Sequence, residues 1–90
     1  MRAEHLAELI KTAIPDAEVE AVDVRGGDHF EVRVVSARFD GAPLVARHRL
    51  VYSALGDAMQ GEVHALTIQA WTPAERDARA PRANATNDRS

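Results

Sequence analysis

The apolar positions near the start of the chain follow a helical period. Over "AEHLAELIKTA" they recur at the spacing of one face of an amphipathic helix, at Leu6, Leu9, Ile10 and Ala13. Pro15 and Asp16 then interrupt the pattern, so we predict a helix of about three turns that covers one face of a sheet.

Alternation of apolar and polar residues replaces the helical period after Asp16. "AEVEAVDV" alternates imperfectly, and "HFEVRVV" alternates well, with Phe30, Val32 and Val34 on one face. Gly26 and Gly27 lie between the two stretches and favour a tight turn. The pattern predicts a β-hairpin whose second strand buries Phe30 and its two alternate neighbours.

A second helix is predicted after the turn sequence "RFDGAP". Pro43 suits the first helical position, where its missing N–H costs nothing. We expect Gly61 to cap the helix at its C-terminus and Gly56 to lie inside it, at a cost of about 1 kcal/mol relative to alanine. The inward stripe of this helix is expected to be Leu44, His48, Val51 and Leu55.

The residue pattern in the last third of the chain predicts a strand, a short helix and a tail. "VHALTIQAW" alternates, with His64, Leu66, Ile68 and Ala70 on one face. "TPAE" then combines an N-cap at Thr72, a proline at the first helical position and Glu75 at the third, which is a capping box. Residues 81–90, "PRANATNDRS", show no periodicity, so we expect one domain over residues 1–80 followed by a disordered polar tail.

These elements give the order α-β-β-α-β-α, an α+β domain with a three-stranded mixed sheet and helices packed on it. If the second and third strands pair directly, the helical connection makes them parallel, and both begin at the same end of the sheet. His29 and His64 would then converge. Strand alternation would direct them to opposite faces, so their meeting requires that His29 belong to the turn.

Length, composition and charge narrow the class of protein. Ninety residues suffice for one domain with one small core, and 46% hydrophobic and 28% charged residues are typical of soluble globular proteins. No apolar run approaches the roughly 18 residues of a membrane span. Acids at Glu4 and Glu8 argue against a targeting peptide, so we expect a cytoplasmic protein.

Charge and cysteine content limit the candidate chemistry. The net charge of -3 argues against a dedicated nucleic-acid binder, because phosphate binding normally needs a basic surface. The chain has no cysteine, so it cannot build a thiolate metal site alone. Any sulfur ligands of a metal centre would have to come from a partner.

"DHFEVRVVSARFDGAPLVARHRLVYSAL" followed by "VHALTIQAWTPAE" resembles the BolA-like protein family. The similarity covers roughly residues 3 to 76, with several motifs in order at matching separations. The resemblance implies a fold similar to class II KH domains and a partnership with a monothiol glutaredoxin around a shared [2Fe-2S] cluster. It also implies two ligands from this chain: His64, in "VHAL", and His29, in the hairpin. The partner's cysteine and glutathione would complete the site.

The implied site is chemically coherent with a chain that lacks cysteine. Imidazoles that replace thiolates on one iron give a Rieske-like mixed site with a raised reduction potential. The chain would then supply half of the ligands and hold no cluster by itself.

Other candidate residues have simpler interpretations. Arg38, Arg47 and Arg49 are either solvated or form a contact surface for a partner, a glutathione carboxylate or DNA phosphate, and Arg47 and Arg49 should diverge on the helix. We expect His48 to be a structural imidazole and His5 a surface residue. Trp71 is interpreted as a packing residue rather than a base-stacking platform.

No residue has the context of an activated nucleophile, so we expect no enzymatic activity. The favoured hypothesis is a non-catalytic adapter in iron-sulfur cluster trafficking or iron homeostasis, which binds a monothiol glutaredoxin. The alternative is a DNA-binding transcriptional regulator that uses the KH-like surface and the arginines of the second helix, although no GxxG clamp is present. The free protein is expected to be a monomer or a weak homodimer.

Overall fold

The computed structural model describes residues 2–26, 29–56 and 65–84, with side chains through Ala78. The elements, in order, are α1 (Ala3–Ala13), β1 (Glu18–Arg25), β2 (His29–Val35), a 3-10 turn η1 (Ala37–Phe39), α2 (Leu44–Leu55), β3 (Ala65–Trp71) and α4 (Pro73–Asn84). This order confirms the predicted α-β-β-α-β-α arrangement. No helix within these ranges is both long and apolar enough to cross a membrane.

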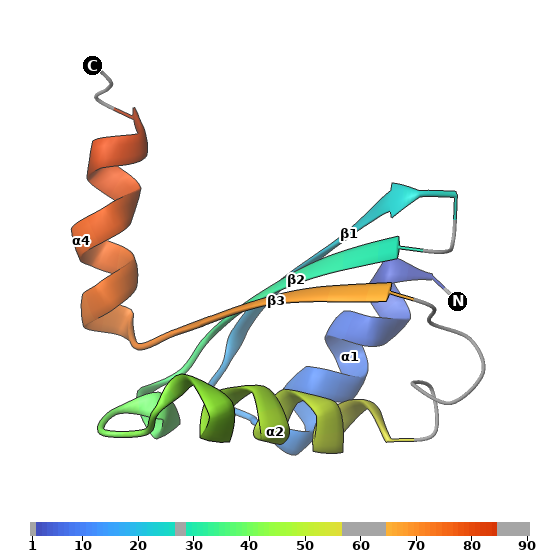
Figure 1. The fold of residues 1–90 in the computed structure, drawn as a ribbon, viewed down its shortest axis with the longest axis horizontal. Coiled ribbons are helices and arrows are strands. Elements are labelled where there is room, and N and C mark those ends of the chain that lie inside the picture. Colours follow the sequence, from blue (N-terminus) through green and yellow to red (C-terminus); the bar gives the residue numbers. More distant parts are fainter. Residues whose placement is uncertain (1, 27–28, 57–64, 85–90) are drawn as a thin grey trace.

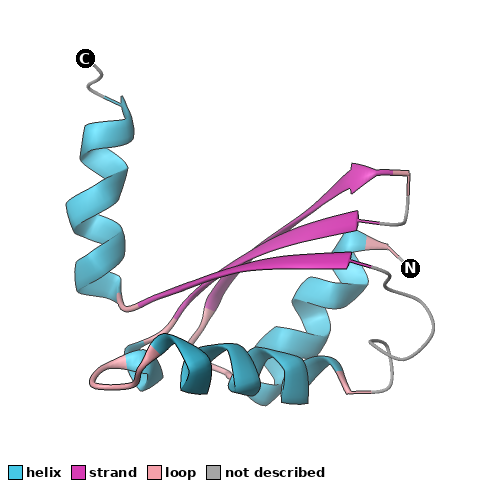
Figure 2. Cartoon of the chain, viewed as in Figure 1, coloured by secondary structure: helices cyan, strands magenta, loops and turns pink. Residues whose placement is uncertain are grey.

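The sheet has the order β1-β2-β3, with β1 antiparallel to β2 and β2 parallel to β3, as predicted. Helices α1 and α2 lie against one face of this sheet, whereas α4 leaves the end of β3 and stands away from the two other helices (Figure 1). Figure 2 shows the same division, with the second face of the sheet free of helices over most of its length. The fold therefore has a two-layer body and one projecting helix.

The core lies between the sheet and the two helices that cover it. Alternation sends one face of β2 inward, and Phe30 and Val34 are completely buried while Val32 is 2% exposed. Leu6 and Ile10 of α1 meet them, one helical turn apart. These contacts confirm Leu6 and Ile10 of the first helix and the inward face predicted for the second strand of the hairpin, whereas Ala13, also predicted to face inward, is exposed.

The inward stripe of α2 differs from the prediction. Val51 and Leu55 are buried as expected, but Leu44 is 62% exposed and Arg47 occupies the buried position one turn before Val51. The guanidinium can replace an apolar side chain here because nearby carbonyl and carboxylate groups satisfy its donors. The prediction assumed that every arginine lies at the surface, so it left Arg47 out of the inward stripe.

Gly56 ends α2 and does not lie inside it. Its φ of +54° and ψ of -128° are incompatible with continuing the helix, and its N–H donates to the carbonyl of Tyr52 at 3.0 Å. The predicted cap, Gly61, lies outside the described residues. The helix is shorter than expected because glycine readily takes this positive φ.

Hydrogen bonds to the Asp16 side chain fix the connection after β2. The Asp16 carboxylate accepts hydrogen bonds from the Ser36 hydroxyl at 2.8 Å and from the Ala37 N–H at 3.1 Å. The turn η1 that follows buries Phe39 completely. The stretch was predicted only as a turn, and the contribution of Phe39 to the core was not predicted.

The capping box before α4 is present as predicted. The Glu75 N–H donates to Thr72 Oγ1 at 3.1 Å, and the Thr72 N–H donates to Glu75 Oε1 at 2.9 Å. Arg76, in the first turn, forms ion pairs with Asp77 and with Glu18 of β1, and these two hydrogen-bonded contacts raise the pKa of its guanidinium. The start of α4 is thus joined to the sheet.

The predicted disordered tail begins too early. Residues 81–84 form the last turn of α4, so the prediction is wrong for them, and residues 85–90 lie outside the described residues. Pro81 removes one backbone hydrogen bond, but extending a helix already nucleated by a capping box is easier than starting one.

Candidate functional site

The starts of β2 and β3 lie side by side, and His29 is the first residue of β2. In the parallel register His29 is the partner of Ala65, the first residue of β3. On its other side His29 pairs with Arg25, where the β1 register shifts between Asp23 and Arg25. This confirms that β2 and β3 begin at the same end of the sheet.

The His29 side chain lies on the helix-free face of the sheet. Its neighbour Phe30 points into the core, so alternation directs the imidazole the other way. His29 Nε2 is 3.1 Å from Thr67 Oγ1, and the hydroxyl can accept from or donate to this nitrogen according to the tautomer. The ring is half-buried and is held across the strand pair by this contact.

The sequence pattern required His29 to lie in the turn if it was to meet His64, and the structure does not meet this requirement. His29 belongs to β2 and not to the turn, because it completes the pairing with Arg25 and Ala65. His64 lies outside the described residues, as do Gly27 and Asp28 of the hairpin. Within the part of the chain that the structure describes, no group of three or more histidine or acidic side chains could hold a metal ion.

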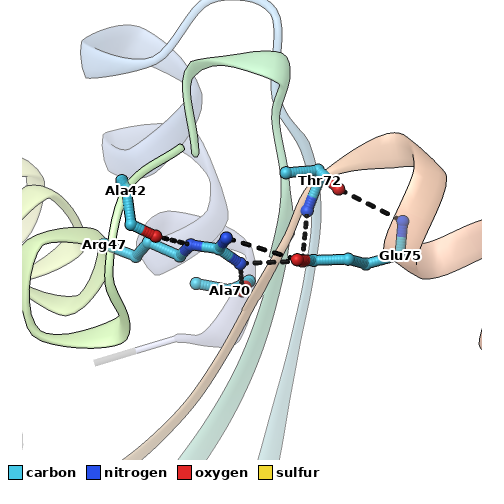
Figure 3. A network of polar contacts seen from close by, with 5 residues as sticks. All are labelled: Ala42, Arg47, Ala70, Thr72 and Glu75. Carbon is cyan, nitrogen blue, oxygen red and sulfur yellow. Dashed lines mark hydrogen bonds and ion pairs between the residues drawn. The ribbon is translucent and has the colours of Figure 1, made fainter. Parts of the chain in front are cut away.

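Arg47 is the centre of a buried polar network (Figure 3). Its Nε donates to the carbonyl of Ala42 at 2.8 Å, and its Nη1 donates to the carbonyl of Ala70 at 3.0 Å. Nη1 and Nη2 also reach Oε1 and Oε2 of Glu75, at 2.7 and 3.3 Å. The bidentate pair joins α2, the end of β3 and the start of α4.

The three candidate arginines do not form one surface. Arg47 is 8% exposed, so the solvated alternative is wrong for it, and its role as a partner contact stays a prediction. Arg49 is exposed, which confirms that the two side chains diverge. Arg38 is exposed and its Nη1 donates to the carbonyl of Ala13 at 3.4 Å. A contact surface for an anion could include Arg38 and Arg49 but not Arg47.

The helix-free face of the sheet also carries the cationic side chain of Arg33. The Arg33 guanidinium lies 5.0 Å from the centroid of the Trp71 ring and forms an ion pair with Glu20 at 3.3 Å. Its Nε also donates to Gln69 Oε1 at 3.3 Å. Trp71 is half-buried in this contact, in agreement with a packing role.

The two remaining described histidines agree with their simpler interpretations. His48 is half-buried beside β3, and His5 is exposed on α1, 4.0 Å from a carboxylate oxygen of Glu8. Two partners lie outside the predicted site residues: Thr67, which contacts His29, and Glu75, which pairs with Arg47. The parallel pairing carried the signal for Thr67, since a residue two positions after Ala65 shares its face.

These features define a small α+β domain with a three-stranded mixed sheet, two covering helices and a histidine at the joint start of its parallel strands. A family model described as "BolA-like protein" matches residues 6–75. The chain belongs to the BolA-like protein family.

Curated relatives agree with this assignment. "BolA-like protein 1" of Mus musculus is 53% identical over 55 residues, which are 61% of this chain and 40% of the mouse protein. An "uncharacterized protein in rpoN-murA intergenic region" of Acinetobacter guillouiae is 45% identical and covers 83% of this chain and 89% of its own. A protein of Vibrio cholerae named "DNA-binding transcriptional regulator BolA" is 42% identical over 69% of this chain and 58% of its own. The match thus spans less than half of the mouse relative.

Solved structures share the fold. A bolA protein homologue from Coxiella burnetii has a TM-score of 0.76 at 36% identity, covering 86% of this chain and 97% of the other. The BolA domain of SufE1 from Arabidopsis thaliana has a TM-score of 0.73 at 40% identity, with coverage of 82% and 94%. Yeast Fra2 has a TM-score of 0.72 at 26% identity, with coverage of 100% and 98%.

Proposed function

We propose that this chain is a non-catalytic adapter that binds a monothiol glutaredoxin and shares a [2Fe-2S] cluster with it. The glutaredoxin cysteine and glutathione would supply sulfur ligands, and His64 and His29 would supply imidazole ligands, as the resemblance to the BolA-like family implies. The role would lie in iron-sulfur cluster trafficking or iron homeostasis.

The observation that carries the proposal is the pairing of His29 with Ala65. His64 precedes Ala65 in the chain, and consecutive Cα atoms are about 3.8 Å apart. Paired strands are about 4.8 Å apart, so His29 lies close to Ala65, the residue that follows His64 in the sequence. The two ligands that the resemblance implies are therefore the first residue of β2 and the residue that precedes β3 in the sequence, at the end of the sheet where both parallel strands begin.

The His29 ring is suited to act as a ligand through Nδ1. Metal-bound histidines usually donate their other ring N–H to a fixed acceptor, which sets the tautomer. Thr67 Oγ1 can be that acceptor for Nε2–H, and Nδ1 contacts no polar group among the described residues. Because the chain has no cysteine, its donor set also fits a half-site that requires thiolates from a partner.

The test mixes the protein with a cluster-loaded monothiol glutaredoxin and records visible circular dichroism and EPR. Wild type should give a spectrum of histidine-ligated character that His64→Ala abolishes and His29→Ala alters. His5→Ala, an exposed histidine of α1, is the matched control and should behave as wild type. If wild type leaves the glutaredoxin spectrum unchanged, the adapter role is wrong.

DNA binding remains a second candidate because the Vibrio cholerae relative is named a DNA-binding transcriptional regulator. Exposed Arg38 and Arg49 would be the phosphate contacts in this chain. This function predicts binding that weakens steeply with salt and that Arg49→Ala reduces while the cluster spectrum is unaffected. The net charge of -3 and the burial of Arg47 make it the weaker candidate.

A further inference from the structure

The two edges of the sheet differ in their protection against pairing with another strand. The edge strand β1 has charged residues at Glu18, Glu20, Asp23 and Arg25, and its register is irregular near its end. Charges and irregularities of this kind are how proteins prevent edge pairing. The other edge strand, β3, reads "ALTIQAW" and has no charged residue, proline or glycine over seven residues. Of the two edge strands, only β1 therefore has features that prevent pairing with another strand.

The outer backbone groups of Leu66 and Ile68 in β3 are available, whereas the outer carbonyl of Ala70 is already hydrogen-bonded. In a parallel ladder, successive residues direct their N–H and C=O groups to opposite sides of the strand. The Trp71 carbonyl accepts from the Ser36 N–H on the β2 side, whereas the Ala70 carbonyl accepts from Arg47 on the outer side. Leu66 and Ile68 share the outward direction of Ala70, and no described residue forms a hydrogen bond with their outer groups.

Helix α2 places apolar side chains beside this edge. Leu44 is 62% exposed, Val45 63% and Tyr52 43%, and these three account for most of the large hydrophobic side chains that the described surface exposes. Leu44 and His48 also line a groove of about 610 Å³ whose other wall is formed by Ile68 and Trp71. Leu44 of the apolar flank of α2 and Ile68 of the free edge therefore border the same groove.

We propose that this surface binds a second copy of the chain, with β3 pairing antiparallel to β3 of the copy about a two-fold axis. The product is a six-stranded sheet in which the apolar flanks of the two α2 helices approach each other. An uncharged strand can pair with itself without like-charge repulsion, which a strand such as β1 cannot do. Among the described residues, Arg47 and Glu75 are the charged residues that line the groove, and they neutralise each other, so this lining offers no charge to select an acidic or basic partner.

The first measurement is sedimentation equilibrium of the full chain from micromolar to millimolar concentration. Leu44→Glu is the test variant, because a carboxylate in the first turn of a helix does not harm the fold. It should raise the concentration for half-association by about tenfold or more, since it places two like charges in the interface. Val22→Lys, which adds a charge to an exposed valine of β1, is the matched control and should associate as wild type.

Amide hydrogen exchange identifies the strand that pairs. The Leu66 and Ile68 amides should become protected as the protein concentration rises, while the Thr67 and Gln69 amides, already bonded to β2, should not change. A protein that stays monomeric at millimolar concentration overturns the proposal. Protection of Leu66 and Ile68 that appears only when a glutaredoxin is added also overturns it, and would assign the edge to a strand of that partner.

Discussion

Arg47 Nη1 lies 2.7 Å from Glu75 Oε1, and this contact joins the middle of the fold to the helix that projects from it (Figure 3). Glu75 serves two purposes at once, since Oε1 also accepts the Thr72 N–H of the capping box. The same carboxylate therefore starts α4 and neutralises the buried guanidinium. Arg47, which the sequence suggested as a surface residue, and Glu75, which it suggested only as a helix cap, therefore belong to one structural unit.

Replacement of Arg47 should be costly. Arg47→Met keeps much of the apolar volume but removes the hydrogen bonds that Arg47 donates to the Ala42 and Ala70 carbonyls and to Glu75, so we expect the free energy of unfolding to fall by about 1 to 3 kcal/mol. Urea denaturation followed by circular dichroism measures this loss. The exposed Arg49→Met should change stability by less than about 0.5 kcal/mol. Equal effects at the two positions would show that burial of Arg47 contributes nothing.

Loss of the Asp16 carboxylate should loosen the junction between α1 and the end of β2. Asp16→Ala removes the acceptor for the buried Ser36 hydroxyl and for the Ala37 N–H, and we expect a loss of about 1 to 3 kcal/mol. Asp40→Ala, at an exposed position after η1, is the control. The prediction fails if both variants have the same midpoint in thermal denaturation.

Gly56 should resist substitution although space is available around it. An added Cβ would meet only the Ser53 carbonyl oxygen at 3.9 Å, so any cost comes from the backbone conformation and not from a clash. We expect Gly56→Ala to cost about 1 to 3 kcal/mol because its φ of +54° and ψ of -128° strain an L-residue. The measurement is the unfolding midpoint in urea, and an unchanged midpoint contradicts the assignment of strain.

The hydroxyl of Thr67 should tune the proposed cluster site without being a ligand. Thr67→Val removes the contact that orients His29 and should weaken formation of the shared cluster by about 10- to 100-fold. Thr67→Ser retains the hydroxyl and should restore it. Titration of the cluster-loaded glutaredoxin with each variant, followed by visible circular dichroism, gives the ratio.

Thr12→Val controls for the general effect of removing a threonine hydroxyl, because Thr12 Oγ1 donates only to the Glu8 carbonyl within α1. If Thr67→Val and Thr67→Ser behave alike, the hydroxyl does not orient the ring.

The periodicity of the sequence determined the elements of this protein. "AEHLAELIKTA" gave the bounds of α1, and the alternation of "HFEVRVV" gave the buried face of β2, because each buries one regular face against the core. The capping box at Thr72 was equally predictable from the sequence, since its two hydrogen bonds join residues only three apart. Local patterns report interactions that are local in the chain.

Only the tertiary structure decided which polar residues are buried and which strand edge is free. Arg47 and Glu75 are 28 residues apart, and His29 and Thr67 are 38 apart, so no local pattern connects them. Arg47 can be buried because the fold places the carbonyls of Ala42 and Ala70 and the carboxylate of Glu75 within hydrogen-bonding distance of its guanidinium. Burial of a charge depends on partners that the chain brings together only when it folds.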